Sequence, residues 1–183
     1  MATSTTIPDD TVTDNLYRIF LTATPMQFHQ GMHWYDEARA TVDTMRDIDP
    51  TLSVECAASI LSAFSPRCRW STNKAKALRF AARLDVSGLS AHRKAATEAR
   101  SIGFCALRGM KTNAFARNIA GDLSAVTVDT WMHKAAGYDN RKAPTVRQYR
   151  QIAKAITYLA DANGIAPAQM QAIIWIALRG NHE

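Results

Sequence analysis

The sequence predicts an all-α fold, and three observations support this prediction. Apolar side chains recur every three or four residues along nearly every segment of the 183-residue chain, which is the spacing of amphipathic helices. No run of β-branched residues is bounded by hairpin turns. Glycine and proline, the residues that interrupt helices, are scarce at 8 and 6 copies.

The expected helices follow one another with short connections. Asp49 and Pro50 suit the N-cap and first turn of the third helix, Pro66 lies in the polar turn that should end it, and Pro144 and Pro167 should open the last two helices. The helices are expected at 15–23, 31–48, 51–64, 72–84, 90–101, 111–120, 129–136, 145–163 and 168–179.

The length and the hydrophobic content of 47% suit one compact domain, which we place at residues 12–183. Residues 1–11 are polar and are expected to be frayed. No apolar run is long enough for a membrane span, and no signal-peptide pattern is present. We therefore expect a cytoplasmic protein with no membrane partner.

Metal and cofactor chemistry has little support in the sequence. Cys56, Cys68 and Cys105 are an odd and scattered set that fits neither a disulfide framework nor a metal site, so we expect reduced thiols. The five histidines form no HExxH pattern. We predict neither a metal nor a cofactor.

The charge is divided unevenly along the chain. Residues 1–50 carry three arginines against eight acids, a net of −5, whereas residues 51–183 carry nineteen Lys and Arg against eight acids, a net of +11. A basic body of this kind suits a polyanion such as DNA, although many basic proteins bind none.

Three stretches carry a family resemblance. Residues 60–78 read ILSAFSPRCRWSTNKAKAL, residues 126–137 read VTVDTWMHKAAG, and residues 171–180 read QAIIWIALRG. In this order they resemble the LSAQ…NKA stretch, the VDTH…R helix and the penultimate helix of endonuclease III-like helix-hairpin-helix DNA glycosylases. The resemblance implies a two-lobed helical fold in which the N-terminal helices pack with the C-terminal helices. The middle helices, at about 72–137, would contain the site.

Asp129 is the catalytic residue that the resemblance implies. Cleavage of an N-glycosidic bond builds positive charge on the sugar, and a fixed carboxylate near C1′ stabilises that charge. Asp129 also stands where a helix N-cap is expected, and the two roles are compatible.

Lys111 is a second possible catalytic residue. It precedes Asp129 by 18 positions, as the lysine nucleophile does in bifunctional members of the family, and KTNA resembles their KTAN. However, the hairpin motif LPGVGxK appears only as LRGMK at 107–111. An alternative alignment deletes the hairpin and makes Lys111 a basic surface residue. The iron-sulfur motif of the family is absent from the sequence.

Further residues are expected to contact DNA around the turn at 65–71 or to line a base pocket. Phe64 replaces the glutamine of LSAQ, although it also suits the last core position of its helix. Tyr35 and Trp131 are assigned to the base pocket, and Tyr35 also suits a core or boundary position. The expected DNA-contacting residues are Phe64, Arg67, Arg69, Trp70, Asn73 and Lys74.

The sequence thus predicts a monomeric, DNA glycosylase-like protein that acts on a base flipped out of duplex DNA. One alternative is a DNA-base-modifying enzyme on the same fold, resembling those of phage-type thymine hypermodification. The other is a non-catalytic derivative that binds DNA or protein.

Overall fold

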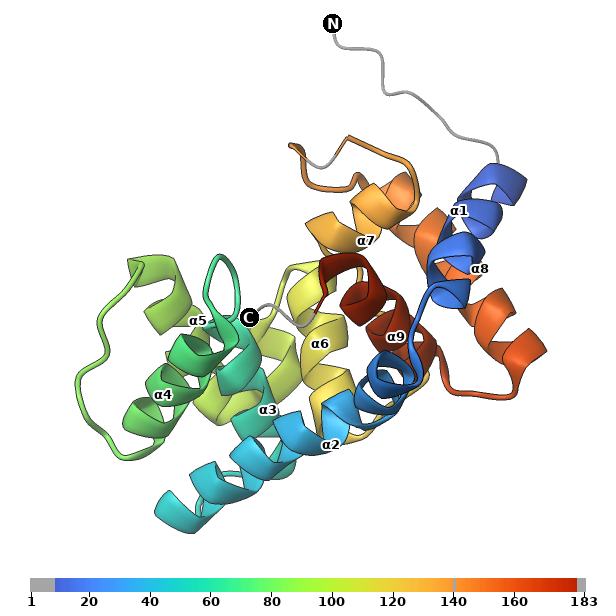
Figure 1. Cartoon of the computed structure of the whole chain (residues 1–183). Helices are drawn as coiled ribbons and strands as arrows, with labels where there is room; N and C mark the ends of the chain where they lie inside the picture. The colour runs from blue at the N-terminus through green and yellow to red at the C-terminus, as the bar shows by residue number, and fades with distance from the viewer. Residues whose placement is uncertain (1–8, 140, 181–183) are drawn as a thin grey trace, which may run out of the picture. The chain divides into compact units, whose positions relative to one another are not determined.

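The computed structural model describes residues 9–139 and 141–180, and all regular structure within these ranges is helical, which confirms the all-α prediction. Figure 1 shows the helices along the chain. They are α1 (Asp9–Leu21), α2 (Pro25–Ile48), α3 (Val54–Ala63), α4 (Trp70–Ala81), α5 (Ser90–Ile102), the 3-10 helix η1 (Gly103–Ala106), α6 (Met110–Ala120), α7 (Thr130–Ala135), α8 (Val146–Asn163) and α9 (Pro167–Arg179).

The chain divides into two compact units. The first holds the described residues up to Trp34 together with those from Val126 onward, and the second holds residues 35–125. Helix α2 therefore contributes residues to both units. Residues 9–11, which were expected to be frayed, form the first turn of α1, and residues 1–8 lie outside the described ranges.

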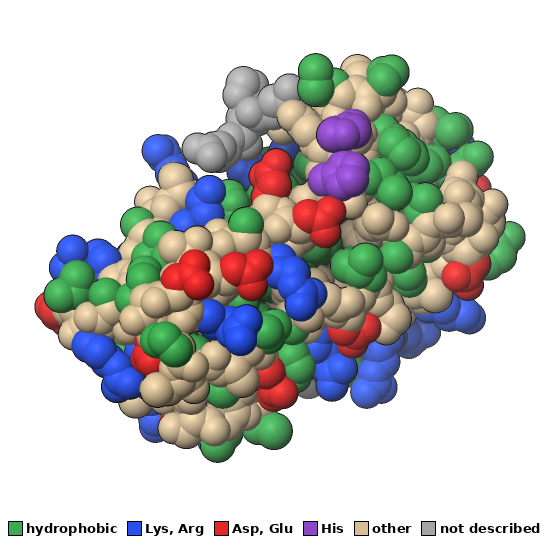
Figure 2. All heavy atoms as spheres, turned by 90° about the horizontal axis from the view of Figure 1, so that it is seen from below, with side chains coloured by type: hydrophobic (Ala, Val, Ile, Leu, Met, Phe, Trp, Pro, Cys, Tyr) green, Lys and Arg blue, Asp and Glu red, His purple; other side chains and the backbone are tan. Residues whose placement is uncertain are grey.

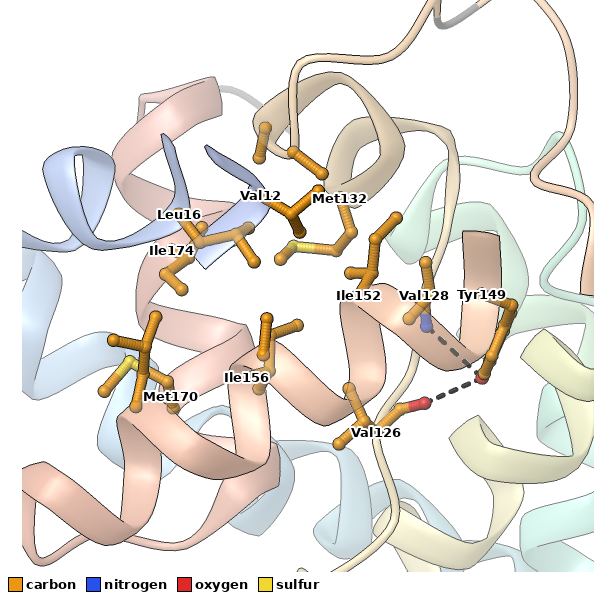
Figure 3. Packing of buried hydrophobic residues seen from close by; sticks show 14 of the residues in the cluster. Val12, Leu16, Val126, Val128, Met132, Tyr149, Ile152, Ile156, Met170 and Ile174 are labelled. Carbon is orange, nitrogen blue, oxygen red and sulfur yellow. Dashed lines mark hydrogen bonds between the residues drawn. The ribbon is translucent and has the colours of Figure 1, made fainter. Parts of the chain in front are cut away.

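The first unit packs α1, α7, α8 and α9 around one apolar core, in which α1 lies alongside α8 (Figure 1). Figure 3 shows this core from close by. Its fully buried members include Val12, Leu16, Met132, Ile152, Ile156, Met170 and Ile174.

The α2 and α9 backbones approach closely at Gly31. A Cβ atom at Gly31 would lie 2.6 Å from the Cα atom of Ile173, nearer than real Cβ atoms approach such an atom. Only glycine fits this position without a shift of the helices.

The second unit is built around α3, which lies between α5 and α6 and also contacts α4 (Figure 1). Residues 57–63 of α3 are buried without interruption, which explains why its sequence, VECAASILSA, is apolar all round rather than on one face.

The expected cap of α3 was wrong. Ser53 is the N-cap, and its hydroxyl accepts the N–H of Cys56 at 3.0 Å. Asp49 instead lies buried and pairs with Arg100, and its second contact, with Arg83, measures 3.2 Å. A hydrogen bond from Thr51, followed by the bond from Arg100, lowers the pKa of Asp49 to about 2.

The last two helices begin close to the expected positions. Thr145 caps α8, because its hydroxyl accepts the N–H of Gln148 while the Gln148 side chain accepts the N–H of Thr145. Pro167 occupies the first turn of α9. Across residues 9–139 and 141–180, no helix is long and apolar enough to cross a membrane.

Candidate functional site

Asp129 is held by three N–H donors. It is the N-cap of α7, and its Oδ1 atom accepts the backbone N–H groups of Trp131 and Met132, both at 2.9 Å. Its Oδ2 atom accepts the indole Nε1–H of Trp175 at 3.0 Å. The side chain is half-buried. The sequence predicted the two backbone bonds of the cap but not the bond from Trp175.

The segment before Asp129 is anchored in the core of the first unit. Val126 and Val128 are buried, and the Tyr149 hydroxyl from α8 donates to the Val126 carbonyl at 2.7 Å (Figure 3). The same oxygen accepts the Val128 N–H at 3.4 Å. Burial raises the pKa of Tyr149, and the negative charge of Asp129 adds to the rise. Tyr149 thus fixes the backbone that presents Asp129.

Trp175 belongs to a stack of indole and cationic groups in the first unit. The Arg179 guanidinium lies 4.3 Å from the ring centroid of Trp175 and 5.3 Å from that of Trp131. The Lys134 Nζ atom lies 5.4 Å from the Trp131 ring, and the ring centroids of Trp34 and Trp175 are 5.3 Å apart. Two cations therefore lie beside the aromatic rings next to the carboxylate.

The sequence prediction for this stack was incomplete. Trp131 was assigned to a base pocket, whereas Trp175 was assigned to the core and proves to be half-buried with a polar contact. Arg179 was missed as a site residue. Its position four residues after Trp175 on one helix was the available signal, because such pairs lie on the same face.

The Asp129 carboxylate retains some capacity to accept a further hydrogen bond. A carboxylate has about four lone-pair sites, and three are used within the described residues, two on Oδ1 and one on Oδ2. The Oδ2 atom therefore remains able to accept a proton from water or to face a developing cation. Within residues 9–139 and 141–180, no cluster of three or more His, Cys, Asp or Glu is arranged to hold a metal ion.

Lys111 lies in the second unit, whereas Asp129 lies in the first. Its Nζ atom donates to the Ser65 hydroxyl at 2.8 Å and lies 4.9 Å from the Phe115 ring centroid. Both contacts suit a charged ammonium. Lys111 is therefore tied to the turn after α3.

Phe115 brings further predicted residues together. The Trp70 ring meets it edge-on with centroids 6.2 Å apart, and the Tyr35 ring does so at 6.3 Å. The Lys74 Nζ atom lies 5.7 Å from the Trp70 ring. Tyr35 is only 6% exposed, so its ring is part of the packing around Phe115 and not an open pocket wall.

Two of the expected DNA-contacting residues are buried. Phe64 is 2% exposed and packs edge-on against Phe80 at 5.6 Å, so the bland interpretation as the last core residue of its helix is correct. Asn73 is 1% exposed, because it lies on the inner face of α4. Neither side chain reaches DNA in this conformation.

Arg67 and Arg69, in contrast, are exposed in the turn between α3 and α4. Arg67 has a φ of 55°, in the left-handed region that non-glycine residues rarely adopt. Arg69 is the residue before α4, and its side chain makes no cap hydrogen bond. On the face shown in Figure 2, basic and acidic side chains are interspersed.

The fold and the site define an all-helical protein whose capped carboxylate is hydrogen-bonded to a tryptophan and flanked by cations. Over residues 1–182 the chain matches the model of a family of unknown function (DUF7178), and it belongs to this family. No curated protein and no solved structure matches it. The similarity to helix-hairpin-helix DNA glycosylases remains a prediction from the sequence.

Proposed function

We propose that this protein acts on a base flipped out of duplex DNA and excises it, with Asp129 as the catalytic carboxylate. The observation that carries the proposal is the way Asp129 is held. Three N–H donors fix its orientation, and one of them comes from a tryptophan 46 residues away in the chain. A helix cap alone requires only the two backbone bonds.

The chemistry follows from this geometry. As the bond between C1′ and the base nitrogen breaks, positive charge develops on the sugar, and a carboxylate of fixed position stabilises it without reorganising. Water then adds to C1′ and the base leaves with a proton. The free acceptor site of Oδ2 is suited to orienting that water.

Charged side chains near Asp129 support a nucleic-acid substrate. Arg179 and Lys134 lie over the indole rings beside the carboxylate and would neutralise phosphates next to the extruded base. In the second unit, the exposed Arg67 and Arg69 are proposed as further phosphate contacts.

Lys111 is proposed as a possible nucleophile in a strand-cleaving reaction. It would have to leave Ser65 and lose a proton before its nitrogen could attack C1′. Borohydride trapping tests this role, since it reduces a Schiff base to a stable covalent adduct. A Lys111→Gln variant that still traps would exclude Lys111.

The test of excision uses duplexes that carry uracil or an oxidised, alkylated or hypermodified base. Released base is measured by chromatography for the native chain and for Asp129→Asn, with Asp14→Asn, an exposed acid of the first unit, as the matched control. We expect release to be lost in Asp129→Asn and retained in Asp14→Asn. Equal release by both variants would sink the role of Asp129.

The same experiment separates the two alternatives. Mass spectrometry of digested DNA would show an added group if the protein is a base-modifying enzyme. DNA binding that Asp129→Asn leaves unchanged, with no product from any duplex, would mark a non-catalytic binding protein. We also propose that the protein acts as a monomer in the cytoplasm, which light scattering and cell fractionation would test.

A further inference from the structure

The second unit contains an open groove that the proposed excision chemistry does not use. It has a volume of about 350 Å³ and lies between one face of α5, the segment from η1 into α6, and the end of α3. Small-molecule sites measure roughly 300–1,000 Å³, so it has room for one compact ligand. Its apolar surface comes from small side chains, namely Ala63, Pro66, Ala91, Ala95, Ala106 and Leu107.

The charged residues of the groove are mostly cationic. His92, Lys94 and Arg108 line it, and Glu98 is its acid. Lys94 and Arg108 are exposed, and neither forms an ion pair within residues 9–139 and 141–180. Burial, and then the nearby positive charge of Lys76, lowers the pKa of His92. The groove therefore holds positive charge that no protein acid neutralises, which favours an anion.

The start of α6 adds backbone donors to the same groove. Gly109 is the N-cap residue and supplies no side-chain cap bond, and both Gly109 and Thr112 line the groove. The first N–H groups of a helix lack intrahelical partners and favour an anion. In combination with Lys94 and Arg108, they form a site for a phosphate group.

We propose that this groove binds a nucleotide. The phosphate would lie against Lys94, Arg108 and the first turn of α6, and the base would lie on the small apolar side chains. Glu98 accepts hydrogen bonds and suits an amino group of the base or a sugar hydroxyl. An acidic peptide fits less well, because Glu98 would repel its second carboxylate. The nucleotide belongs either to a nucleic-acid strand or to the free pool.

The proposal does not depend on Asp129, which lies in the other unit. The full chain is titrated by calorimetry with thymidine 5′-monophosphate, adenosine 5′-monophosphate, inorganic phosphate, hexaglutamate and a ten-nucleotide single strand of DNA. Two variants test the groove separately by charge and by shape. Lys94→Gln with Arg108→Gln removes the charges, and Ala91→Leu fills the groove from α5.

We expect the charge variant to weaken mononucleotide binding at least tenfold, since a charge-assisted hydrogen bond contributes about 1.5–3 kcal/mol. Ala91→Leu should weaken it as well, with unchanged helical content by circular dichroism. Arg147→Gln with Arg150→Gln, two exposed arginines of α8, is the matched control and should bind mononucleotide as the native chain does. Bound phosphate should raise the pKa of His92, measured by NMR.

The two sources of nucleotide give different results. Binding of the strand at least a hundredfold tighter than either mononucleotide, with loss of both in the charge variant, assigns the groove to a nucleic-acid strand. Similar affinities assign it to free nucleotides. Asp129→Asn should retain mononucleotide binding, so failed excision leaves the groove assignment intact. The proposal is overturned if inorganic phosphate or hexaglutamate binds as tightly as the mononucleotides, or if the groove variants bind normally.

Discussion

The bond between Asp129 and Trp175 gives the sharpest test of how the site is built. Asp129→Ala removes the helix cap, which is worth about 1 kcal/mol, and leaves the half-buried Trp175 N–H without its partner, at a cost of about 2 kcal/mol. The total loss of unfolding free energy is therefore about 3 kcal/mol. For a chain of this length it corresponds to a fall in Tm of roughly 6–12 °C.

Asp129→Asn should behave differently. Asparagine caps helices as well as aspartate does, so only the charge of the acceptor is lost, at about 1 kcal/mol. Asp14→Ala, a change at an exposed acid of α1, should shift stability by less than about 0.5 kcal/mol.

The assay is chemical denaturation followed by far-ultraviolet circular dichroism, with a double-mutant cycle that pairs Asp129→Asn with Trp175→Phe. We expect a coupling free energy of about 1 kcal/mol, because Trp175→Phe removes the Nε1–H donor. If Asp129→Ala and Asp129→Asn cost the same and the coupling is zero, Asp129 is a simple cap and the reasoning is refuted.

Four further predictions concern pH and packing. Burial lowers the pKa of His133, so stability should fall as pH drops below 6.5, and His133→Leu should flatten this slope of the denaturation midpoint. Asp49, whose folded pKa is about 2, should stabilise the fold above pH 3.8 and lose this effect between 3.8 and about 2, unlike Asp49→Asn. Tyr149→Phe should cost about 2 kcal/mol in urea unfolding. Gly31→Ala should cost about 1–3 kcal/mol in the same measurement, because its Cβ meets Ile173.

Local patterns predicted the helices well and failed where distant residues decide. The all-α class and most helix positions follow from apolar spacing and from proline. Asp49 looked like a cap because Pro50 follows it, yet its main partner, Arg100, is 51 residues away. No local rule identifies such a pair.

The same distinction applies to the candidate site. Asp129 was identified from its own short motif, and its cap bonds are local. Trp175 and Tyr149 could not be assigned from the sequence, because a tryptophan between isoleucines and a tyrosine in an amphipathic helix are usual core residues. Their polar atoms contact the segment around Asp129 only after α8 and α9 have packed.

The tryptophans also make the site observable without any label. Three of the four tryptophans of the chain, Trp34, Trp131 and Trp175, belong to the stack beside Asp129. Indole emission depends on nearby charge and hydrogen bonding, so a molecule that displaces Arg179 or competes for Asp129 should change the intrinsic fluorescence. The protein can therefore be screened against nucleotides, damaged duplexes and small molecules in its native form, with the emission of its own side chains as the signal.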